Sequence, residues 1–163
     1  MRRTTLVILL TVVVAGALGG GFRWWRHSQI PSRVNASEYE SDMTEGLVRG
    51  VLRELGGGGP PVCFLAFGEG RTPPSPNFIA RFANTYPELR SSGSSVSPPN
   101  GKYFEVSNGK PGLIMRVISF REITPSVFEG VVAFSNLPAS RDRFVYRVAK
   151  QDGEWVVLSR KPE

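Results

Sequence analysis

The feature that most constrains this chain is a run of 19 residues without a charged side chain, Thr4–Phe22. As a helix, this run would be about 28 Å long, close to the ~30 Å hydrocarbon core of a bilayer. Arginines precede it, and a pair of indoles flanked by cations follows it, which is typical of a headgroup layer. The sequence therefore predicts a signal-anchor or transmembrane segment over residues 1–27, with a membrane interface formed by Arg23, Trp24, Trp25 and Arg26.

A cleaved signal peptide is the alternative interpretation of the same segment. Its basic start, apolar stretch and small-residue site Ala15-Gly16-Ala17 have the form that a signal peptidase recognises. Cations on the two sides of the segment nearly balance, so the orientation depends on the signal-like start. We expect a single-pass membrane protein with its domain on the extracytoplasmic side, and secretion after cleavage is the alternative.

The net charge of +6 belongs almost entirely to the N-terminal region. Residues 1–33 contain five arginines and no acid, whereas the remainder contains 15 basic and 14 acidic side chains. A nucleic-acid-binding domain needs a surplus of cations on its folded surface. We therefore expect no nucleic-acid partner. The expected partners are the lipid bilayer, through the N-terminal segment, and a protein or small apolar ligand near the membrane.

A short linker, 28–36, precedes a predicted small α+β domain over residues 37–163. Ser37, with Glu40 three residues later, forms a capping-box pattern and predicts a helix that Gly56–Gly59 ends. The apolar run 62–67 has the length of a strand buried on both faces. Ser75-Pro76 predicts the start of a second short helix, ending near Asn84.

The last 60 residues are strand-like. Residues 84–101 are rich in Ser, Gly and Pro and leave room for an irregular edge strand around Leu89–Val96, which the sequence does not place. Asn108-Gly109 and Asp152-Gly153 are typical hairpin turns. Trp155 is expected in the core. The predicted fold is α+β: an N-terminal membrane helix, then two helices packed on a curved antiparallel sheet of about four to six strands. The strand segments lie near Lys102–Val106, Leu113–Phe120, Val127–Phe134, Phe144–Lys150 and Trp155–Ser159.

The closing pattern Asp152-Gly153-Glu154-Trp155-Val156-Val157, with the order of elements before it, resembles the cone-shaped domains of the nuclear transport factor two superfamily. These are relatives of ketosteroid isomerase. The resemblance implies a curved sheet and helices around a pocket, in a superfamily that includes enzymes and binding modules. Its isomerases use an acidic residue as the base and a tyrosine as the hydrogen-bond donor. No motif in this chain identifies a residue for either role. Three helices are usual in that superfamily, and two are predicted here.

The residue inventory excludes several chemistries. The one histidine, His27, lies next to the predicted membrane segment, and the one cysteine, Cys63, lies inside the apolar run and is expected to be a core thiol. Sites built on Ser-His-Asp, Cys-His or zinc ligands lack their residues in the domain. Gly56–Gly59 follows a helix instead of opening one, so it does not predict a phosphate loop. We expect no cofactor and no metal.

Carboxylate chemistry without histidine remains. Glu105 and Glu129 lie in strand-like segments, where such side chains are usually solvated on the polar face; in an apolar pocket, either would act as a base. Arg116, Arg147 and Tyr103 would form either an anion-binding surface or an ordinary half-exposed sheet. The sequence favours a membrane-tethered extracytoplasmic interaction or ligand-binding module. The alternative is a histidine-free acid/base enzyme of the isomerase or hydratase type.

Overall fold

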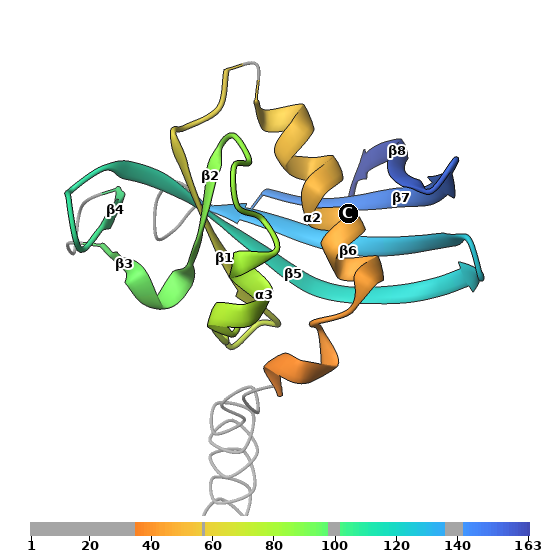
Figure 1. The fold of residues 1–163 in the computed structure, drawn as a ribbon, viewed down its shortest axis with the longest axis horizontal. Helices are drawn as coiled ribbons and strands as arrows, with labels where there is room; N and C mark the ends of the chain where they lie inside the picture. Colours follow the sequence, from red (N-terminus) through yellow and green to blue (C-terminus); the bar gives the residue numbers. More distant parts are fainter. Residues whose placement is uncertain (1–34, 57, 98–101, 136–141) are drawn as a thin grey trace, which may run out of the picture. The chain divides into compact units, whose positions relative to one another are not determined.

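The computed structural model describes residues 35–56, 58–97, 102–135 and 142–163. The predicted membrane segment, 1–27, lies outside these residues. No helix within the described ranges is long and apolar enough to cross a membrane. The elements, in chain order, are η1 (Ala36–Glu38), α2 (Asp42–Leu55), β1 (Val62–Phe67), α3 (Pro76–Ala80), β2 (Glu88–Ser91), η2 (Ser92–Ser94), β3 (Ser95–Val96), β4 (Tyr103–Glu105), β5 (Pro111–Thr124), β6 (Val127–Ser135), β7 (Asp142–Gln151) and β8 (Glu154–Pro162) (Figure 1).

The long helix α2 begins later than the capping-box pattern predicts. Ser37 lies in the single turn of η1, and Ser41 caps α2 by accepting a hydrogen bond of 3.2 Å from the backbone N–H of Thr44. Glu40 does not complete a capping box, because its carboxylate accepts hydrogen bonds from the backbone N–H and the hydroxyl of Ser75, at 2.6 and 2.8 Å. A contact 35 residues away in sequence thus replaces the local one. The helix ends before Gly56, as predicted.

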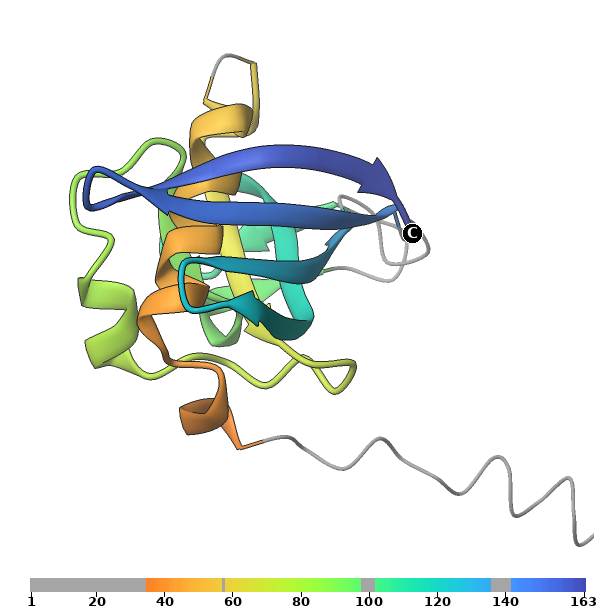
Figure 2. The same ribbon diagram turned by 90° about the vertical axis from the view of Figure 1, so that its right-hand side faces the viewer.

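The helix α2 packs across one face of the sheet, against β6, β7 and β8 (Figure 2). Its apolar stripe includes Leu47, Val48 and Val51, each fully buried. Burial of these side chains against the sheet is the main stabilising contribution of the helix. The sheet side of this core is formed by Cys63, Leu65, Phe67, Met115, Val117, Phe128, Val132, Tyr146 and Val148.

The predicted antiparallel sheet of four to six strands is wrong in two respects. The sheet has eight strands in the order β2-β1-β5-β6-β7-β8, with β4 paired to β5 and β3 to β4. It is also mixed, because β1 runs parallel to both β2 and β5. Parallel neighbours need crossover connections. The connection from β1 to β2 contains α3, and the chain from β2 to β5 contains the short strands β3 and β4. The α+β class and the two α-helices are confirmed.

The local predictions for strands and turns are largely confirmed. All six residues of β1 are buried, as expected of an interior strand. Ser75 caps α3, with Pro76 in its first turn, although the helix ends at Ala80 and only turns continue to Asn84. Asp152 and Gly153 both have positive φ, 51° and 85°, as a tight hairpin turn requires. Trp155 is only partly buried at the edge of the core, and not fully inside it as predicted.

Candidate anion-binding site

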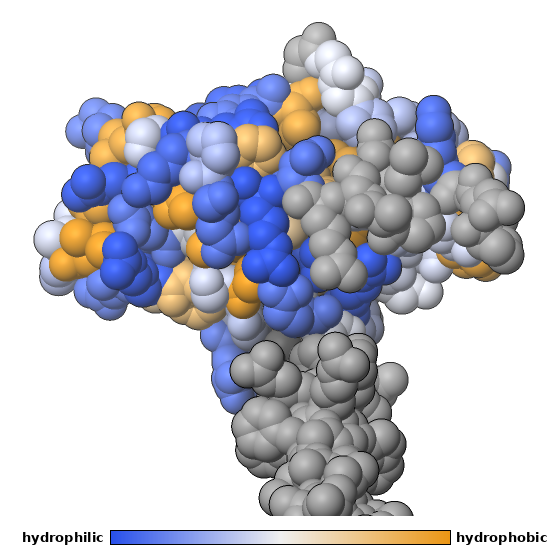
Figure 3. Space-filling view, turned by 180° about the vertical axis from the view of Figure 1, so that it is seen from behind, coloured by the Kyte–Doolittle hydropathy of each residue, from blue (hydrophilic) through white to orange (hydrophobic). Residues whose placement is uncertain are grey.

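The face of the sheet opposite α2 carries two arginines in one row. Val117 and Val132 belong to the core under α2, so Arg116 and Ala133, their chain neighbours, point to the other face. The register aligns Arg116 with Ala133 and Ala133 with Arg143, on β5, β6 and β7. We call the face of β5–β8 away from α2 the open face. Viewed from this side, the molecule is mostly hydrophilic, with apolar patches between the polar residues (Figure 3).

Arg116 is the most unusual residue of the open face, because its guanidinium is both buried and only partly bonded. Its side chain is 4% exposed, and Nη1 donates a hydrogen bond of 3.2 Å to Glu69 Oε2. Nε and Nη2 are buried and have no hydrogen-bond partner among the described residues. These two nitrogens form one edge of the guanidinium, with parallel N–H groups at the spacing of the two oxygens of a carboxylate or phosphate. An anion with two oxygens fits this edge.

Two further arginines surround Arg116. Arg143 Nη2 donates to Glu69 Oε1 at 2.5 Å, so Glu69 bridges Arg116 and Arg143; Arg143 also pairs with Glu163 at 3.5 Å. Arg71 Nη1 donates to the Tyr103 hydroxyl at 2.8 Å. We define the arginine cluster as Arg71, Arg116 and Arg143. Among the described residues, its three positive charges have two carboxylate partners, Glu69 and Glu163, so the cluster carries an excess of positive charge there.

The electrostatic setting of the cluster also favours an anion. Burial lowers the pKa of Arg116, and the positive charges of Arg71 and Arg143 lower it further, against the opposing effect of Glu69. Hydrogen bonding to Glu69 raises the pKa of Arg143. The charged form of Arg116 is therefore disfavoured by its surroundings, and an added negative charge would relieve this.

The structure brings together two of the three residues that the sequence suggested for an anion site. Arg116 and Tyr103 both lie at the cluster, because Arg71 donates to the Tyr103 hydroxyl and the charge of Arg71 acts on Arg116. Arg147 does not: it is exposed on β7, opposite Glu129. Sequence reasoning missed Glu69 and Arg71, which lie in the turn directly after the buried strand β1. Polar residues at the end of a buried strand are the signal that would have found them.

Glu105 is buried, with 5% exposure, contrary to the expectation that it is solvated. The pairing of β4 with β5 brings Tyr103 into a second small core with Phe64 and Ile114, and Glu105, two residues further, points to the same side. Its Oε1 lies 3.4 Å from Arg90 Nε, while Oε2 has no hydrogen-bond partner among the described residues. Glu105 is therefore half of a partly buried ion pair.

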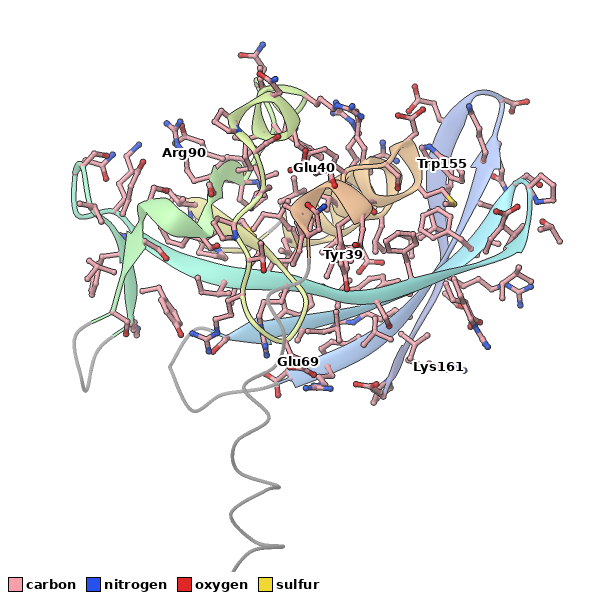
Figure 4. All side chains as sticks on the ribbon, turned by 90° about the horizontal axis from the view of Figure 1, so that it is seen from below. Tyr39, Glu40, Glu69, Arg90, Trp155 and Lys161 are labelled. Carbon is pink, nitrogen blue, oxygen red and sulfur yellow. The ribbon has the colours of Figure 1, made fainter. Side chains whose placement is uncertain are left out.

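Glu129 lies on the open face and is held by Arg121, whose Nε and Nη2 donate to Glu129 Oε2 at 3.2 and 2.6 Å. These hydrogen bonds lower the pKa of Glu129, which makes it a weaker base than a free carboxylate. Glu129 does border a hollow of about 370 Å³, together with Ser119, Phe120, Arg121, Val131, Val145 and Lys161. Lys161 and Glu69 lie on the side of the sheet away from Tyr39 and Trp155 (Figure 4).

The described residues contain no group of three or more His, Cys, Asp or Glu side chains arranged to hold a metal ion. Comparison of the chain with protein-family models, curated proteins and solved structures found no match. The resemblance to the nuclear transport factor two superfamily therefore stays a prediction. The candidate site has to be judged on its own geometry, in which the unbonded edge of Arg116 is the leading feature.

Proposed function

We propose that this protein is a membrane-tethered extracytoplasmic binding module that takes an anionic ligand at the arginine cluster. The observation that carries the proposal is the buried Nε/Nη2 edge of Arg116. Leaving a buried donor without a partner costs about 1–3 kcal/mol, and more for a charged group. A bidentate anion removes this cost and forms two charge-assisted hydrogen bonds in its place.

The turn that carries Glu69 and Arg71 is suited to admit a ligand. The Glu69 side chain is 41% exposed whereas that of Arg116 is 4% exposed, so solvent reaches Glu69, and an anion that took its place would keep the buried guanidinium paired. Gly68 and Arg71 both have positive φ, at 64° and 55°. The charged side chains of Glu69 and Arg71 therefore lie within one tight turn.

The tether rests on the sequence. The uncharged segment and the Arg-Trp-Trp-Arg motif that follows it support a retained anchor. A linker over residues 28–36 would reach at most about 30 Å when fully extended. A ligand or partner of the domain would then be met close to the bilayer.

The geometry favours binding over acid/base catalysis. Arg121 lowers the pKa of Glu129, whereas a general base at neutral pH needs a raised pKa. The Glu105 carboxylate is held in an ion pair with Arg90. We therefore rank the histidine-free enzyme second.

The test is thermal denaturation of the full chain in a non-ionic detergent, with chloride replaced by acetate or inorganic phosphate at constant ionic strength. A ligand that binds only the folded state raises the midpoint as its concentration rises. We expect this rise for the wild type. We expect Arg116→Lys, which keeps the charge but loses the fork, to weaken binding about tenfold.

Arg147→Lys is the matched control, because it makes the same change at an exposed arginine of the same face. It should respond to acetate and phosphate like the wild type. An equal response in all three proteins would contradict a site at Arg116, and so would a wild-type midpoint that neither anion changes.

A further inference from the structure

The row next to the arginines on the open face is apolar at its centre. The register aligns Ser119 with Val131, Val131 with Val145, and Val145 with Lys161. Val131 lies two residues from Ala133, and Val145 two residues from Arg143, so this row is about 7 Å from the row of Arg116. The row beyond it is charged again, with Arg121, Glu129 and Arg147. An apolar strip thus lies between two charged rows.

This strip forms the floor of the hollow of about 370 Å³. Val131 and Val145 are both only half-buried, so they retain apolar surface that a ligand could cover. The volume lies at the lower end of the range for small-molecule sites. No residue of the arginine cluster lines the hollow itself, but the register places the hollow and the cluster in neighbouring rows of one face, the first apolar at its centre and the second cationic.

We infer that the ligand is an amphipathic carboxylic acid, with its carboxylate on the Nε/Nη2 edge of Arg116 and its apolar part over Val131 and Val145. This inference rests on the proposed function and names its ligand class. A planar carboxylate matches the fork of a guanidinium, and its negative charge offsets the excess of positive charge that the cluster carries among the described residues. An inorganic anion would satisfy Arg116 but leave the two valines uncovered.

The test compares three probes, acetate, hexanoate and hexanamide, by ligand-observed NMR on the full chain in a non-ionic detergent, with protein-free micelles as the blank. Hexanoate should bind at least about tenfold more tightly than acetate, because its extra methylene groups are partly removed from water. Hexanamide, which has the same chain without the charge, should bind more weakly than hexanoate. Arg116→Lys should weaken hexanoate binding about tenfold.

Substitutions in the hollow separate the apolar contact from the charge. Val131→Thr and Val145→Thr keep the branched shape and should lower hexanoate affinity towards that of acetate, while acetate binding stays unchanged. Val127→Thr makes the same change on the same strand outside the hollow, and should bind hexanoate like the wild type.

Each other outcome has a defined meaning. Equal binding of acetate and hexanoate, both dependent on Arg116, would overturn the amphipathic ligand and leave the proposed anion site standing. Equal binding of hexanoate and hexanamide, unaffected by Arg116→Lys, would show an apolar hollow that works without the arginine, and would overturn the inference. Binding of none of the probes would remove both the inference and the proposed function.

Discussion

Cys63 is the residue whose surroundings determine its chemistry most completely. It lies in β1, between Leu89 of β2 and Leu113 of β5 in the register, and is fully buried. Burial raises the pKa of its thiol from 9.0 to about 12. The thiolate is the reactive form of cysteine, so the folded protein should hold this thiol protonated and unreactive at neutral pH.

We therefore predict that iodoacetamide at pH 8 labels the native full chain very slowly, and that labelling becomes complete in denaturant. Because Cys63 is the one cysteine in the sequence, mass spectrometry reads the site without ambiguity. Burial also raises the pKa of the Tyr146 hydroxyl to about 12. Both raised pKa values favour the folded state below pH ~9, and this contribution to stability is lost as the pH rises towards 12. Native labelling at the rate of a free thiol would show that β1 is not buried.

At the scale of elements, the contact between α2 and β8 depends on a glycine. Gly46 is buried in α2, and a Cβ atom added there would collide with the ring of Trp155. Trp155 also packs edge-to-face on Phe128, with ring centroids 5.1 Å apart. The helix therefore approaches the last strand closely at a position where any larger residue would force the indole to move.

We predict opposite effects of one substitution in two backgrounds. Gly46→Ala alone should destabilise the protein by about 1–3 kcal/mol, because overpacking outweighs the ~1 kcal/mol gain in helix propensity. In a Trp155→Ala background the collision is absent, so Gly46→Ala should be neutral or stabilising. Urea denaturation of the four proteins measures this coupling. Additive effects would mean that the two residues do not touch.

Trp155→Ala by itself should cost about 2–3 kcal/mol, less than for a fully buried tryptophan, because the side chain is only partly buried. A Trp155→Ala protein with an unchanged denaturation midpoint would contradict the packing of the terminal hairpin on α2.

At the scale of the whole molecule, retention of the N-terminal segment decides where the domain acts. We predict retention, because the uncharged stretch is long enough to span a bilayer and Arg23 and Arg26 follow it closely. The mature protein should then have the intact mass of the uncleaved chain and stay in the membrane fraction after carbonate extraction. A mass beginning at Leu18, with the protein in the soluble fraction, would refute the anchor and indicate secretion.

The sequence by itself determined those parts of the fold that depend on neighbouring residues. Asp152-Gly153 forms its turn because both residues tolerate positive φ, and Ser75-Pro76 begins α3 because it suits a helix start. The run around Cys63 is a buried strand because it has no polar side chain to expose. Each of these outcomes follows from local chemistry that the surrounding structure does not override.

Only the tertiary structure decided the features that join distant residues. Helix α2 begins at Asp42 and not directly after Ser37, because the Glu40 carboxylate bonds to Ser75. Strand β1 is parallel to its neighbours because crossover connections place β2 and β5 beside it. Arg116 and Glu69 are 47 residues apart in the chain and meet only through the turn after β1. Such contacts depend on which strands pair and in which register, and this is set by packing of the whole core, because no short stretch of sequence contains both partners.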